Sequence, residues 1–179
     1  MTFLLSDTQQ SIRTRSERAF RHLSVLIAVD DEVREKWHTA FKRVRGEERC
    51  EQLGAAHLLW HGIYAFKVHA GKAGRTDLVF PEPHGDPETY ADALVLTEWK
   101  KATKSDASKQ FAQAVRQAKN YAHGPLAGNE LHSYRYAVVV TEQEVELPPD
   151  DTHNGITYRH INIAIDPHTP SRAARSRPN

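Results

Sequence analysis

Residues 91–102 read ADALVLTEWKKA, and this stretch decides the fold. Its residues are almost continuously apolar up to Thr97, which is typical of a central strand covered on both faces of a sheet. Residues two apart in a strand share a face, so Glu98 and Lys100 are expected to project together at its end. A carboxylate beside so apolar a run is costly unless it has a partner or a task. The stretch therefore predicts a buried strand that ends in a charged pair.

Upstream, residues 74–80 read GRTDLVF and predict a neighbouring strand that carries Asp77. A loop with three prolines separates the two strands and lets them run side by side. Asp77, Glu98 and Lys100 would then meet at one place. Two carboxylates on rigid strands suit Mg²⁺, which takes hard oxygen ligands, and the carbonyl of Trp99 offers a further oxygen.

Downstream, residues 105–122 predict an amphipathic helix that Ser105 is suited to cap. Gln117 and Tyr121 lie four residues apart in it and therefore share a face. An amide and a phenol on that face could hold a phosphate or the attacking water of a metal site.

The residues before this core predict an N-terminal helical extension over 1–45, because neither Gly nor Pro occurs from Ser6 to Arg45. Asp30 and Asp31 are suited to cap a second helix at its start. The first segment is rich in arginine, and its arginines are expected to form a solvated face, with phosphate contact as the alternative. They are Arg13, Arg15, Arg18 and Arg21.

A third helix is expected from Gly46 to Gly62, with acids in its first turns, and a strand follows over 63–69. Two further strands are predicted over 134–141 and 158–165, joined by a loop over 148–155. The last strand alternates strictly, which predicts an edge strand with one wet face. Its wet face would carry His160 and Asn162, and its dry face Ile161, Ile163 and Ile165.

The domain organisation that follows is a core over 46–166 and a flexible basic tail over 167–179. Lys plus Arg is 24 and Asp plus Glu is 23, so the overall charge does not indicate a nucleic-acid partner. Cys50 is the only cysteine, which excludes an internal disulfide and an iron–sulfur cluster and favours a reducing, cytoplasmic location. No apolar run approaches the roughly 20 residues that span a bilayer.

In order, GRTD, EWK and QAKNY resemble the motifs of the PD-(D/E)XK nuclease superfamily, and specifically its RecB-like branch, which adds Q-x-x-x-Y. The resemblance covers roughly residues 46–142, with Thr76 in place of the proline. It implies an α/β fold with a restriction-endonuclease-like αβββαβ core, in which helices flank a mixed central sheet.

The resemblance also implies a Mg²⁺- or Mn²⁺-dependent nuclease that hydrolyses phosphodiester bonds of DNA. Asp77 and Glu98 would bind the metal, and Lys100 would act on the nucleophilic water. Gln117 and Tyr121 would support the site or contact the nucleic-acid backbone. Small nucleases of this kind work in repair or in defence against phage and mobile elements.

The branch often has a further metal-binding histidine on the first core helix, and His57 is the candidate, with Glu51 as its rival. His57 and His61 are four apart, as in zinc proteases, but HLLWH lacks the required Glu, so that class is excluded. His61 is instead expected as a helix C-terminal residue favoured by the dipole.

Two other functions stay open. The chain could be a non-cleaving nucleic-acid-binding or scaffolding subunit of the same fold that needs a partner, or a plain structural domain with these residues scattered over its surface. A homodimer is expected if both strands of DNA are cut.

Overall fold

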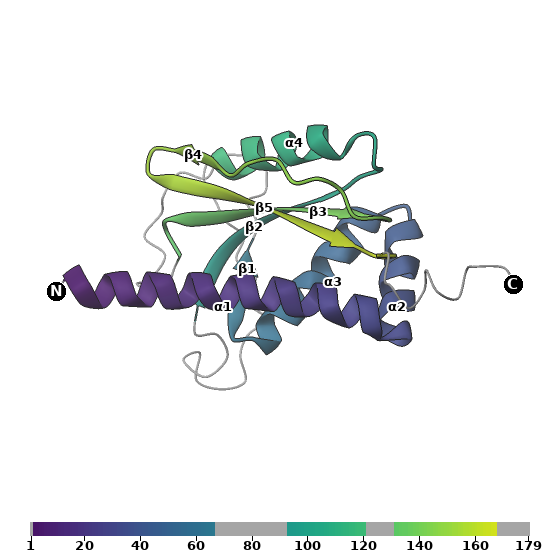
Figure 1. Ribbon diagram of the computed structural model, residues 1–179, viewed down its shortest axis with the longest axis horizontal. Helices are drawn as coiled ribbons and strands as arrows, with labels where there is room; N and C mark the ends of the chain where they lie inside the picture. Colours follow the sequence, from purple (N-terminus) through teal and green to yellow (C-terminus); the bar gives the residue numbers. More distant parts are fainter. Residues whose placement is uncertain (1, 67–92, 121–130, 168–179) are drawn as a thin grey trace, which may run out of the picture.

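The computed structural model describes residues 2–66, 93–120 and 131–167 (Figure 1). Over these ranges the chain forms four helices and five strands. In chain order they are α1 (Thr2–Val29), α2 (Asp31–Lys42), α3 (Gly46–Trp60), β1 (Ile63–Phe66), β2 (Ala93–Lys101), α4 (Ala107–Lys119), β3 (Tyr134–Thr141), β4 (Asp151–His153) and β5 (Ile156–Ala164).

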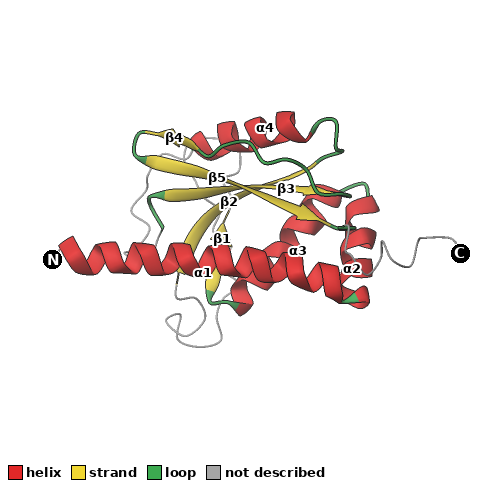
Figure 2. Ribbon diagram, in the orientation of Figure 1, coloured by secondary structure: helices red, strands yellow, loops and turns green. Residues whose placement is uncertain are grey.

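The strands form one mixed sheet in the order β1-β2-β3-β5-β4. The first four strands of that order run parallel, and β4 runs antiparallel to β5. Figure 2 shows α4 on one face of the sheet and α1 and α3 on the other, with α2 beside α3. The predicted α/β class, with helices flanking a mixed sheet, is confirmed for the described residues.

The predicted central strand is confirmed as β2, which pairs with β1 on one side and with β3 on the other. Alternate side chains of β2 enter different cores. Val95 and Trp99 join the large core with α1, α2 and α3, whereas Leu96 packs under α4. The same alternation directs Glu98 and Lys100 toward the face that α4 covers.

Helix α3 lies unusually close to β2, at Gly54. A Cβ atom at Gly54 would overlap Cη2 and Cζ2 of the Trp99 indole. Only glycine allows this approach, so one residue sets the distance between α3 and the central strand.

The N-terminal helices α1 and α2 pack in the same hydrophobic core as one face of the sheet. Phe20, Leu23 and Ile27 of α1 are almost fully buried, and the Phe20 ring lies 5.2 Å from that of Tyr136 in β3. As predicted, Asp30 caps α2, since its side chain accepts hydrogen bonds from the backbone amides of Glu32 and Val33.

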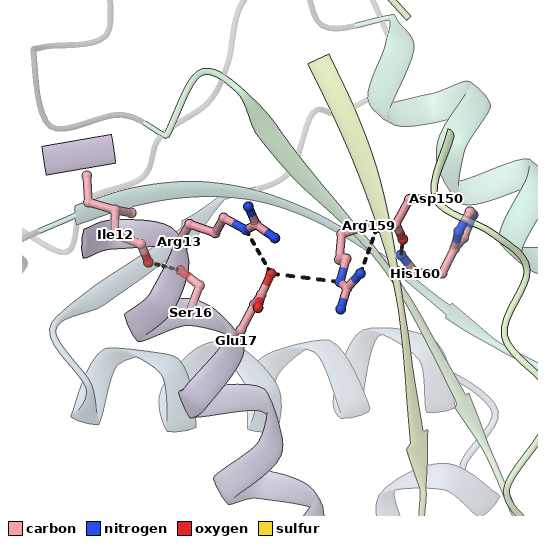
Figure 3. Close-up of polar contacts among 7 residues, drawn as sticks. All are labelled: Ile12, Arg13, Ser16, Glu17, Asp150, Arg159 and His160. Atoms are coloured by element: carbon pink, nitrogen blue, oxygen red, sulfur yellow. Dashed lines mark hydrogen bonds and ion pairs between the residues drawn. The ribbon is translucent and has the colours of Figure 1, made fainter. Parts of the chain in front are cut away.

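A polar network also joins α1 to β5 (Figure 3). Glu17 pairs with Arg13 at 3.1 Å on its own helix and with Arg159 of β5 at 3.8 Å. Arg159 in turn pairs with Asp150 at 2.7 Å. The Arg13 guanidinium also lies 4.2 Å from the ring centre of Tyr134. Arg13 therefore docks α1 on the sheet, contrary to the expected solvated face, whereas Arg18 and Arg21 are exposed.

Two predictions about the last strand are wrong. β5 is not an edge strand, because β4 forms inside the predicted loop over 148–155 and pairs with the first residues of β5. Its predicted wet face is largely covered: Asn162 is half-buried, and its amide donates to the carbonyl of Val139 and the hydroxyl of Thr141. His160 is 6% exposed, and its ring packs edge-on against Phe111 of α4 at 5.2 Å.

Two local predictions differ in detail. Ser105 does not cap α4; Asp106 is the residue before the helix, and its carboxylate accepts bonds from the backbone and hydroxyl of Thr103. The strand predicted over 63–69 is described only as Ile63–Phe66, and the strand predicted over 75–80 lies outside the described residues.

Candidate functional site

The end of β2 meets the beginning of α3 at Lys100. Its ammonium Nζ donates to Oε1 of Glu98 at 3.1 Å and to the carbonyl oxygen of Trp99 at 2.9 Å. It also donates to Oε1 of Glu47, in the first turn of α3, at 2.9 Å. Two carboxylates and one carbonyl thus converge on a single cation.

This cluster is buried at its base and open at one side. The side chains of Glu98 and Lys100 are 1% and 5% exposed, whereas that of Glu47 is 40% exposed. Buried charges are costly unless they are paired, so the three groups depend on one another. Among the described residues, this group combines two carboxyl groups with one ammonium, and Glu47 is its solvent-exposed side.

The donor set fits a hard divalent ion. The three atoms around Lys100 Nζ are all oxygens, and carboxylate and carbonyl oxygens are the ligands that Mg²⁺ takes in proteins. Glu98, Glu47 and the Trp99 carbonyl are therefore the residues that would hold such an ion. The predicted group of Glu98, Trp99 and Lys100 is brought together, and Glu47 joins it.

Gln117 lies on α4, the helix that covers the face from which Glu98 and Lys100 project. Its Oε1 is buried and has no hydrogen-bond partner in the described part of the chain. The neighbouring Ala114 and Ala118 pack against Leu96 of β2. Gln117 thus presents an acceptor inside the layer between α4 and the sheet.

His57 belongs to a different group of side chains. It is 6% exposed, and its Nε2 donates to the carbonyl of Ala19 in α1 at 3.1 Å. Its ring lies 5.3 Å from that of His22 and 5.0 Å from that of His61. Burial is the main cause that lowers the pKa of His57, and the neighbouring imidazoles lower it further. From α3, it is Glu47 that reaches Lys100, one turn before Glu51.

Asp77 and Tyr121, the remaining predicted site residues, lie outside the described residues. Cys50 is fully buried, and burial raises the pKa of its thiol to about 12. A thiol so rarely ionised is unsuited to act as a nucleophile.

Comparison with known proteins finds no matching family, no similar curated protein and no similar solved structure. Within the described ranges, none of the helices combines the length and the apolar character that crossing a bilayer requires.

Sequence reasoning missed Glu47 and His22. The sequence predicts Glu47 only as one of the acids in the first turns of the third helix, because its partner Lys100 lies 53 residues away. His22 carried no local signal. The only pointer to its cluster was the four-residue spacing of His57 and His61, which places two imidazoles on one helix face.

Proposed function

We propose that this protein is a Mg²⁺- or Mn²⁺-dependent nuclease that hydrolyses phosphodiester bonds of DNA. The observation that carries the proposal is the meeting of Glu98, Lys100 and Glu47 at the end of the central strand. The order of GRTD, EWK and QAKNY along the chain supports the same site, with Asp77 as the other acid of the strand pair.

Each residue has a distinct task in this proposal. Glu98 and Asp77, with the Trp99 carbonyl and Glu47, hold the divalent ion, whose charge would stabilise the negative charge that develops on phosphorus. Lys100 orients the attacking water or offsets the negative charge of the phosphate. Gln117 and Tyr121 orient the scissile phosphate from the helix side.

The finer fold belongs to the same proposal. In a restriction-endonuclease-like αβββαβ core, α3, β1, β2, α4 and β3 would be the described elements, and the strand predicted over 75–80 lies outside the described residues. A protein that cuts both strands of a duplex would act as a homodimer.

The test is a cleavage assay on plasmid and linear DNA with Mg²⁺ or Mn²⁺. Lys100→Ala and Asp77→Asn are expected to reduce the rate at least about 100-fold, because loss of one group that stabilises transition-state charge costs factors of this size. Lys109→Ala, which removes an exposed lysine of α4, is the matched control and should leave the rate unchanged.

Circular dichroism and thermal unfolding separate loss of activity from loss of fold. Lys100→Ala leaves Glu98 buried without its cation, which destabilises the fold. Asp77→Asn keeps the test valid if the Lys100 variant does not fold. Cleavage by both variants at the wild-type rate would refute the proposal. DNA that is bound but never cut by the wild type would favour the non-cleaving subunit.

A further inference from the structure

Three histidines meet where α1 packs against α3. His22 comes from α1, His57 from the last turns of α3, and His61 directly follows α3. One ring nitrogen from each lies within 4.8 Å of the others. This is a set of nitrogen donors that the proposed nuclease chemistry does not use.

The spacing of these nitrogens is close to that of metal ligands. Nδ1 of His22 lies 3.1 Å from Nε2 of His61. Two imidazoles bound to one tetrahedral zinc at 2.0–2.1 Å have nitrogens about 3.3 Å apart. His22 and His61 therefore already have the spacing of two ligands of one ion, and a ring nitrogen of His57 lies within 4.8 Å of both.

His57 is held as metal-binding histidines are held. Its Nε2 donates to the Ala19 carbonyl at 3.1 Å, which fixes the ring and leaves the Nδ1 lone pair of the neutral form for a metal. A backbone carbonyl on the second nitrogen is a common partner of ligating histidines. Because Ala19 and His22 are both in α1, the same helix supplies the first ligand and the support of the second.

Exposure gives the site an entrance. His57 is buried and His61 is half-buried, but His22 is exposed, so an ion can arrive from solvent. Imidazole suits Zn²⁺, Cu²⁺ and Ni²⁺ and does not suit Mg²⁺. We propose that His22, His57 and His61 form a Zn²⁺ site that joins α1 to α3 and leaves one coordination position for water.

The first test is zinc binding by the full, tag-free chain after treatment with a chelator. Calorimetry with ZnCl₂ is expected to show one equivalent bound, and a saturating excess of about 100 times Kd should raise Tm by about 5–10 °C. Millimolar Mg²⁺ should not compete. Competition by Mg²⁺ would overturn the proposal, because it would place these residues in an oxygen-rich site.

Variants locate the ion. His22→Ala and His61→Ala should each weaken zinc binding by more than the roughly 10–100-fold that loss of an outer partner costs. His153→Ala, an exposed histidine of β4, is the matched control and should bind as the wild type does. His22 is exposed and His61 is half-buried, so we expect their replacement by alanine to preserve the fold. Unchanged zinc affinity in both would overturn the proposal.

Trp60 provides a spectroscopic report of the same site. It is 82% exposed, and its ring centre lies 6.2 Å from that of His57. One equivalent of Cu²⁺ should quench its fluorescence, and Zn²⁺ added first should block the quenching. Trp60→Phe identifies the signal, since Trp37 and Trp99 are buried. Quenching that persists in His22→Ala would show that Cu²⁺ binds elsewhere and would count against the site.

Discussion

The two ends of α3 carry different kinds of side-chain atoms that could bind a metal ion. At the first turn, Glu47 joins Glu98 and the Trp99 carbonyl in a set of oxygens around Lys100. At the last turn, His57 and His61 join His22 in a set of nitrogens. About 15 Å of helix rise separates Glu47 from His57. The helix dipole favours the acids at the start of α3, so the carboxylates and the imidazoles lie at opposite ends of one helix.

The middle of α3 holds both ends in place. Gly54 lies against the Trp99 indole, and Trp99 is the neighbour in sequence of both Glu98 and Lys100. The helix and the strand are thus fixed at one point between the two clusters. The packing of α3 on β2 therefore fixes where Glu47 and His57 lie.

The largest effect is expected from Gly54→Val, which disturbs both ends together. The added side chain has no space against Trp99, and overpacking in a core costs up to about 3 kcal/mol. For a chain of this size, Tm should fall by about 6–12 °C in differential scanning calorimetry. Ala56→Val on the exposed face of α3 is the control, and its Tm should change little. An unchanged Tm for Gly54→Val would mean that α3 does not sit this close to β2.

Glu47→Gln tests whether the clusters at the two ends of α3 act independently. The amide keeps the shape of the side chain but removes a carboxylate, and we expect Mg²⁺-dependent cleavage to fall by about 10–100-fold. Zinc affinity, measured on the same preparation by calorimetry, should not change. Equal losses in both measurements would show that the ends are coupled through the helix and do not act separately.

A third prediction concerns His160, a buried histidine that belongs to neither cluster, and the dependence of stability on pH. Burial is the main cause that lowers the pKa of His160, although Asp150 and Asp151 act in the opposite direction. An unfolded histidine titrates near pH 6.5, so below that pH the unfolded chain binds a proton that folded His160 resists. Stability therefore falls as pH drops from about 6.5, by up to about 1.4 kcal/mol per pH unit.

Urea unfolding between pH 7.5 and 5, with a chelator present, measures this loss. His160→Gln should show a shallower dependence on pH than the wild type. Equal slopes for the two proteins would show that His160 does not resist protonation in the folded state.

The smallest effect is expected from Asp30→Ala, which removes the cap of α2. Its carboxylate accepts bonds from two backbone amides at 2.9 and 3.1 Å, and loss of such a cap costs about 1 kcal/mol. Chemical denaturation should show this loss, while Glu32→Gln in the same turn should cost only a few tenths. Cleavage and zinc affinity should both stay at wild-type values, since the cap touches neither end of α3.

Local patterns in the sequence predicted most of the elements. The cap at Asp30 and the apolar run of β2 depend on residues within a few positions of each other, and both are confirmed. The face of β5 was misjudged because alternation cannot reveal that α4 covers His160. In the same way, Glu47 and His22 find their partners across tens of residues, where no spacing rule applies.

The network of Arg13, Glu17, Arg159 and Asp150 has a consequence for how the chain is made. It joins the first helix to the last strand, and Phe20 shares its core with Ile163 and Ile165. On the ribosome, α1 emerges long before β5 is synthesised. The apolar face of α1 therefore cannot pack against β5 during most of translation. Contacts between such distant segments slow folding and leave apolar surface open to aggregation meanwhile. We therefore expect the nascent chain to depend on chaperones until β5 is synthesised.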